Sequence, residues 1–157
     1  MEFLAQFHPQ IIHFPIVLLL LYVLFETIGV VFKRDFFSKS AHLILFLGVL
    51  AAVAAVLTGQ QAFNVASSWE EKGAIIQFGA IHEHENWATL TLWYFAALLV
   101  IRTFITFKKK FTGYFQYLFV VLALVGAFFV FETGDHGGHL VYKYGIGTDL
   151  KKAEIEK

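Results

Sequence analysis

The sequence predicts an all-α fold: a bundle of four transmembrane helices with both chain termini on the outer, periplasmic face. Three observations support this prediction. Of the 157 residues, 58% are hydrophobic and only 15% are charged, whereas a soluble domain is about a quarter charged. Four apolar runs each approach the roughly 20 residues that a helix needs to cross a hydrocarbon core. Basic residues gather in two of the connections between the runs, and this bias sets the orientation.

The four apolar runs cover residues 11–32, 41–60, 84–107 and 114–133. None has the 3.6-residue amphipathic period of a helix on the surface of a soluble protein. The alternative, four buried helices of a large soluble protein, is disfavoured because little polar sequence remains to cover them. The first run is too long for a signal peptide and no basic segment precedes it, so we expect it to remain as a helix. The runs form one membrane domain, residues 1–147, followed by a polar tail at 148–157.

The orientation follows from the distribution of lysine and arginine, which are enriched in the cytoplasmic loops of membrane proteins. The connections at 33–40 and 108–112 are therefore predicted to face the cytoplasm. Both termini and the 61–81 loop are predicted to face outward from a bacterial inner membrane, which the chain crosses several times. The basic residues on the cytoplasmic side are Lys33, Arg34, Lys39, Arg102, Lys108, Lys109 and Lys110.

Composition also limits the chemistry that the chain can support. The absence of cysteine excludes disulfides, thiolate metal sites, iron–sulfur clusters and the thioether attachment of a c-type haem. The formal net charge is zero, and there is no basic patch of the kind that binds nucleic acid. A phosphate-binding glycine loop, a nucleophile elbow and a His-Glu-x-x-His motif are all absent. We therefore expect an electron-transfer protein rather than an enzyme with a substrate of its own.

Six of the seven histidines are predicted to lie at the outer end of the bundle, and only His42 on the cytoplasmic side. Neutral imidazole is a common metal ligand, and four-helix bundles build cofactor sites from side chains on facing helices. A b-type haem takes two axial histidines. The clustering therefore predicts one or two b-type haems near the outer face. The six histidines are His8, His13, His82, His84, His136 and His139.

The histidines are ranked by how well their positions suit haem iron. His82 and His84 are two residues apart and would point to opposite faces of a helix, so one metal cannot take both from a regular helix. The candidate axial ligands, in order of preference, are His13, His84 and His136, then His8, then His139 and His82.

The residues around the histidines favour a large flat cofactor. The stretch GDHGGHLVYKYGIG follows the fourth apolar run, and its glycines allow the backbone to approach a ligand closely. We expect Gly137 and Gly138 to fold over the face or edge of a haem, with Tyr142 and Trp87 as walls. A stripe of small residues in the second run has two explanations, close helix packing or a flat bed for the ring. Its members are Gly48, Ala52, Ala55 and Gly59.

Two alternatives to haem remain open from the residues alone. The same histidines could hold zinc or copper, although copper(I) sites usually recruit sulfur ligands and Met1 is the only sulfur-containing residue. The chain could also be a structural subunit whose histidines bond to headgroups or backbone. A separate ionisable residue, Glu26, lies within the first run; it could pair with Arg102 or His42, or contact a proton or quinone.

Three stretches, HPQIIHFPIVLL, HENWATLTL and GGHLVYKYGIG, occur in this order. They resemble a bacterial four-helix membrane protein family catalogued as domain of unknown function 2231. The resemblance covers most of the chain, and its most specific parts are the two-histidine opening and the terminal Gly-Gly-x-Leu-Val-Tyr-x-x-Gly-x-Gly. It implies redox partners, because relatives occur beside or fused to cytochromes. The family's histidines match at His8, His13, His84 and His136, and less closely at His82 and His139.

The expected function combines the histidine cluster with this resemblance. We expect a small b-type cytochrome embedded in the lipid bilayer. It would relay electrons from a membrane donor, a quinone pool or a quinol-oxidising subunit, to an outer-face cytochrome or within a larger redox complex. The iron chemistry would belong to the haem, and the protein would set its ligands, burial and access.

Overall fold

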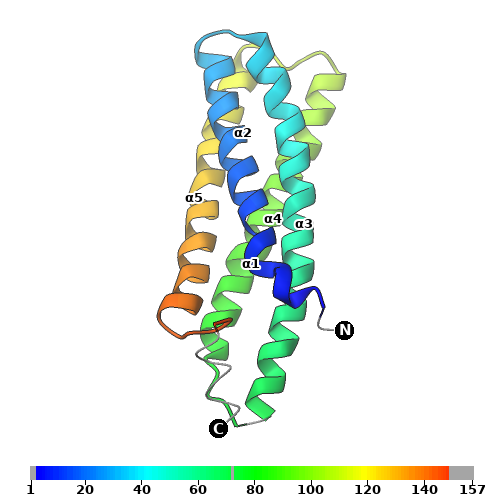
Figure 1. Ribbon diagram of the computed structural model, residues 1–157. Coiled ribbons are helices and arrows are strands. Elements are labelled where there is room, and N and C mark those ends of the chain that lie inside the picture. The colour runs from blue at the N-terminus through cyan, green and yellow to red at the C-terminus, as the bar shows by residue number, and fades with distance from the viewer. Residues whose placement is uncertain (1–2, 72, 149–157) are drawn as a thin grey trace.

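The computed structural model describes residues 3–71 and 73–148, so the predicted polar tail lies outside the described residues except for Thr148. The regular elements of the described residues are helical (Figure 1). They are the 3-10 turn η1 (Ala5–Phe7) and the helices α1 (His8–Ile11), α2 (His13–Val31), α3 (Asp35–Glu71), α4 (Phe78–Phe107) and α5 (Tyr114–Tyr142).

Four helical segments are long and apolar enough to cross a membrane, which confirms the predicted number of spans. The first segment is Ala5–Val31 and joins η1, α1 and α2. Ile12 keeps helical dihedral angles between α1 and α2, with φ −60° and ψ −24°. Pro9 and Pro15 lack a backbone N–H, but both lie within the first turns of their helices, where the loss costs little.

The helices extend beyond the apolar runs, and one prediction about a loop is wrong. The predicted 61–81 loop is largely helical, because α3 continues to Glu71 and α4 begins at Phe78. The glycine-rich stretch after residue 133, whose glycines were expected to fold over a haem, is helical as far as Tyr142, because α5 continues through it. A second small hydrophobic core packs these extensions together. It contains Phe63, Ala66, Trp69, Ala74, Ile76, Phe78, Ile81, Leu140 and Ile146.

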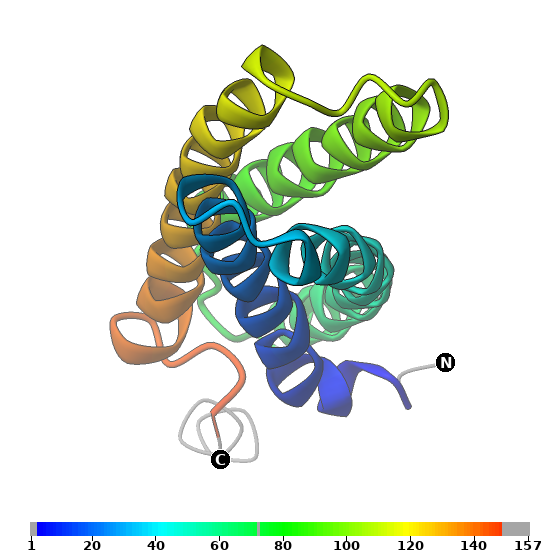
Figure 2. The ribbon, with the colours of Figure 1, turned by 90° about the horizontal axis from the view of Figure 1, so that it is seen from above.

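The helices are arranged so that α2 and α4 lie diagonally opposite each other. Each of them packs against α3 and α5, and Figure 2 shows this order from above. The α2–α3 and α4–α5 connections lie at one end of the bundle. The α3–α4 connection and both ends of the described chain lie at the other, which we call the histidine end (Figure 1).

The core of the bundle contains an ion pair between α2 and α4, close to the end with the α2–α3 and α4–α5 connections. The Glu26 carboxylate lies 2.8 Å from Nη2 of Arg102, and both side chains are almost completely buried. Arg102 also donates a 2.8 Å hydrogen bond to the Ser38 carbonyl at the start of α3, and its guanidinium lies over the Phe111 ring in the α4–α5 connection. Of the partners considered for Glu26, Arg102 is therefore confirmed. His42 instead lies 3.3 Å from the Thr103 hydroxyl.

Candidate functional site

Three histidines at the histidine end are held by the protein through the same ring atom, Nδ1. They are His8 on α1, His84 on α4 and His136 on α5. In each case the Nδ1 atom faces an oxygen of the protein within 3.1 Å. When Nδ1 carries the hydrogen and donates it, Nε2 keeps a free lone pair and can bind a metal.

The partner of His8 is Thr58 on α3. Nδ1 of His8 lies 3.0 Å from the Thr58 hydroxyl oxygen. That hydroxyl donates its only hydrogen within α3, to the carbonyls of Ala54 and Ala55 at 3.0 Å each. When Nδ1 of His8 carries the hydrogen, it donates to this hydroxyl while the hydroxyl donates along α3, so each contact is satisfied and Nε2 keeps its lone pair. Thr58 is buried, which protects this bond from water.

His84 is held in the same way by a neighbouring helix. Its Nδ1 donates to the backbone carbonyl of Thr133 on α5, at 3.1 Å, and a carbonyl can only accept. The Thr133 hydroxyl is itself fixed, because it contacts the hydroxyl of Thr91 at 2.8 Å and donates to the Phe129 carbonyl. The bond to the Thr133 carbonyl orients the His84 ring and leaves the lone pair on its Nε2.

His136 is held within its own helix. Its Nδ1 donates to the carbonyl of Glu132, one turn earlier, at 2.8 Å. Its ring lies against Trp87 of α4, with ring centroids 5.9 Å apart and planes inclined by 35°. Trp87 thus flanks His136, one of the predicted ligands.

Glycines lie directly beside two of the three imidazoles. A Cβ atom at Gly59 would come within 3.1 Å of Cε1 of His8, and one at Gly137 would come within 3.0 Å of Cε1 of His84. A side chain at either position would therefore press on the ring and displace it by a few tenths of an ångström. Gly138 differs, because a Cβ there would meet open space among the described residues. The small-residue stripe of α3 also packs helices, since Gly48 contacts Leu19.

The remaining predicted residues lie further from this arrangement. His13 is exposed on the outside of the bundle, five residues after His8 and thus about 140° around a helix from it. His82 and His139 are more than half exposed and face carboxylates of their own helices, Glu85 and Asp135. Tyr142 is 92% exposed at the end of α5. The structure brings none of these four side chains to the rings of His8 and His84.

The three anchored histidines all lie at the histidine end, on α1, α4 and α5. The His84 ring lies against Gly137, which follows His136 in α5. Within the described residues, however, three or more His, Asp or Glu side chains are nowhere placed to hold a single metal ion. A structural zinc site needs four ligands and a catalytic one usually three, whereas haem iron needs only two from the protein.

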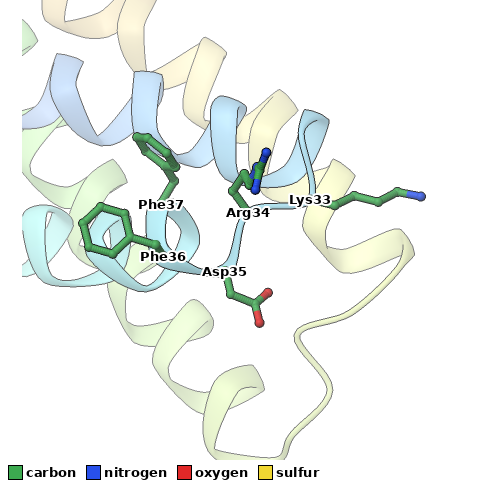
Figure 3. Close-up of a pocket in the computed structure, with 5 residues that line it drawn as sticks. All are labelled: Lys33, Arg34, Asp35, Phe36 and Phe37. Carbon is green, nitrogen blue, oxygen red and sulfur yellow. The ribbon is translucent and has the colours of Figure 1, made fainter.

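A surface pocket lies at the end of the bundle opposite the histidine end. Figure 3 shows its lining, which is a single stretch of chain at the α2–α3 connection. The lining residues are Lys33, Arg34, Asp35, Phe36 and Phe37. Two cations and a carboxylate on an open turn provide no metal-binding chemistry. The lining of this pocket therefore gives no reason to place a metal or redox cofactor there.

Sequence reasoning missed the threonines that orient the histidines. Thr58 and Thr133 lie within or at the end of apolar runs, where a single threonine draws no attention. One signal was available: each is followed by glycine, as Thr58-Gly59 and Thr133-Gly134. Of the glycines beside the rings, Gly137 was predicted as a cofactor contact, and Gly59 was placed only in the small-residue stripe.

Comparison with known proteins gives a family but no activity. A family model described as a predicted membrane protein (DUF2231) matches residues 5–150. No curated protein and no solved structure matches the chain.

Proposed function

The chain belongs to the DUF2231 family of predicted membrane proteins, and we propose that it is a membrane-bound b-type cytochrome that transfers electrons through haem at its histidine end. One observation carries the proposal. His8 and His84 come from different helices, and each has Nδ1 engaged by the protein, Nε2 free and a glycine beside the ring. Histidines that bind metals usually donate their other ring N–H to a protein acceptor in this way.

The residues of the chain have separate roles in this proposal. His8, His84 and His136 are the candidates for holding haem iron. Thr58, together with the carbonyls of Thr133 and Glu132, fixes their tautomers. Gly59 and Gly137 leave room for the rings, and the second hydrophobic core covers this end of the bundle. Bound haem supplies the one-electron chemistry.

The orientation of the bundle is part of the proposal. We place the α2–α3 and α4–α5 connections in the cytoplasm because both are rich in lysine and arginine. The histidine end then lies near the outer face of a bacterial inner membrane. Electrons would pass from a membrane donor such as a quinol pool to an outer-face cytochrome or to another subunit of a redox complex.

The absorption spectrum of the purified protein tests this function. We expect protein made with ample haem to be coloured and to show a sharp b-type alpha band in the dithionite-reduced minus oxidised spectrum. A colourless preparation would rule out the cytochrome. Metal analysis of the same sample would then distinguish a zinc or copper protein from a subunit without a cofactor.

The Thr58→Val variant tests whether a bond on Nδ1 supports the ligand. Valine has nearly the same shape but cannot accept the hydrogen bond, so the N–H of His8 loses its partner. Loss of such an outer-shell partner typically lowers metal affinity by about 10–100-fold, and we expect a decrease of that size in haem affinity. Thr27→Val is the matched control, because Thr27 also donates to the carbonyl one turn earlier but contacts no histidine. Equal haem affinity in both variants would contradict the proposed role of Thr58.

A further inference from the structure

The four long helices form two hairpins that repeat one pattern. The first hairpin, residues 5–71, contains α2 and α3, and the second, residues 78–142, contains α4 and α5. Four buried positions of α2 recur at identical spacing in α4. The corresponding pairs are Pro15 and Thr91, Leu19 and Phe95, Tyr22 and Leu98, and Glu26 and Arg102.

The ends of the hairpins extend the repeat. Lys33 and Lys109 stand just after α2 and α4 and are the two described non-glycine residues with positive φ, at 51° and 54°. The same number of residues separates Lys33 from His8 and Lys109 from His84. The Thr-Gly pairs then recur in the second helix of each hairpin: Thr58 lies 50 residues after His8, and Thr133 lies 49 residues after His84.

Corresponding residues of the two hairpins meet across the centre of the bundle. Glu26 and Arg102 occupy equivalent positions and form the buried ion pair. The helix contacts agree, because α2 packs against α5 as α4 packs against α3. This pattern of helix contacts is the one that an approximate twofold axis along the bundle would produce. His8 and His84 are also equivalent, and both lie at the histidine end, at the start of α1 and near the start of α4.

Only one pair of the six clustered histidines is related by the repeat. Counted from the Thr-Gly pairs, the position equivalent to His136 is Gln61, and that of His139 is Asn64. Counted from His8 and His84, the position equivalent to His13 is Thr89, and that of His82 is Gln6. His8 and His84 alone share their position and an Nδ1 bond to a threonine of the second helix of their hairpin, through the hydroxyl of Thr58 and the carbonyl of Thr133. Each ring also has a glycine beside Cε1, although Gly59 and Gly137 stand at different positions of the repeat.

We propose that His8 and His84 are the two axial ligands of a single haem, one from each hairpin. This inference rests on the proposed function and makes it more specific. Haem iron can take two histidine ligands from the protein, and two equivalent histidines from different hairpins would supply them. His136 is then a neighbouring residue, fixed by Glu132 and Trp87, and not a ligand.

Single alanine variants of the purified haem protein test the pairing. We expect His8→Ala and His84→Ala each to lose the low-spin, six-coordinate absorption and electron paramagnetic resonance signals, and added imidazole to restore them. His136→Ala and the exposed control His13→Ala should keep these signals. Loss of the signals in His136→Ala, together with their retention in His8→Ala or His84→Ala, would overturn the pairing. Wild-type protein without haem would instead overturn the proposed function itself, and the pairing with it.

A cross-linking measurement tests, without haem, whether His8 and His84 lie close together. The chain has no cysteine of its own, so His8→Cys and His84→Cys can be combined in one chain and treated with a short bismaleimide. We expect most of the intact protein to gain one cross-linker bridging both cysteines, as measured by mass spectrometry. The control pair, His13→Cys with His84→Cys, should instead gain two singly attached linkers. The same product from both pairs would contradict the pairing.

Discussion

Replacing Arg102 with methionine is expected to destabilise the protein by about 3–5 kcal/mol, the usual cost of removing one partner of a buried ion pair. The carboxylate of Glu26 would stay in the core without its cation. The variant would also lose the hydrogen bond to Ser38 and the contact with Phe111, which join the start of α3 and the α4–α5 connection to the core. Unfolding in mixed detergent micelles, followed by circular dichroism, measures the change.

The double variant Glu26→Leu/Arg102→Met separates the charge effect from the loss of packing. When both charges are replaced by apolar groups of similar volume, the cost of an unpaired buried charge disappears. We therefore expect the double variant to be more stable than Arg102→Met alone. If the two variants were equally stable, the unpaired carboxylate of Glu26 would not be the cause of the lost stability.

Replacing Gly137 with leucine is expected to lower haem affinity by about 10–100-fold, the range seen when support for a metal ligand is lost. Even the first side-chain carbon would lie 3.0 Å from Cε1 of His84, so a larger side chain must push the ring away from the Thr133 carbonyl. A haem titration of the apoprotein gives the affinity. The same substitution at Gly59, beside His8, should have an effect of similar size.

Gly138→Leu is the matched control, because it lies in the same helix one residue later and has open space around it among the described residues. Leucine favours helix over glycine by close to 1 kcal/mol, so this variant should bind haem normally and be at least as stable as the wild type. Equal haem binding by Gly137→Leu and Gly138→Leu would show that the glycine beside His84 does not matter for the site.

The fold was predictable from sequence because hydropathy alone identifies helices that must cross a membrane. The limits of the helices were not, because hydropathy falls wherever a helix leaves the bilayer. Ser67, Ser68 and Glu70 lie in α3 beyond the apolar run, where packing of Ala66 against Ile76 and Ile81 maintains the helix. The glycines of α5 likewise do not end the helix. Gly137 lies within α5, and its lack of a side chain lets the His84 ring come close to the helix backbone.

The histidine cluster was predictable only as a group. Counting residues along the chain brings six imidazoles to one end, but their directions depend on helical phase. His8 and His13 look like a pair in the sequence, yet a continuous helix separates them by about 140°. The groups that bond to Nδ1 of His8 and His84 are harder still to predict, because Thr58 and the Thr133 carbonyl belong to other helices. The Thr-Gly repeat and the matching spacing of Lys33 and Lys109 were the available clues to an internal duplication.

The number of haems bound per chain tests most directly the central claim that this membrane protein is a cytochrome. The purified apoprotein is titrated with haem, and the bound haem is quantified as the pyridine haemochrome against chain concentration from amino-acid analysis. One haem held between two equivalent hairpins predicts saturation at one haem per chain with a low-spin b-type spectrum. A titration without saturable binding would contradict the claim that this membrane protein is a cytochrome.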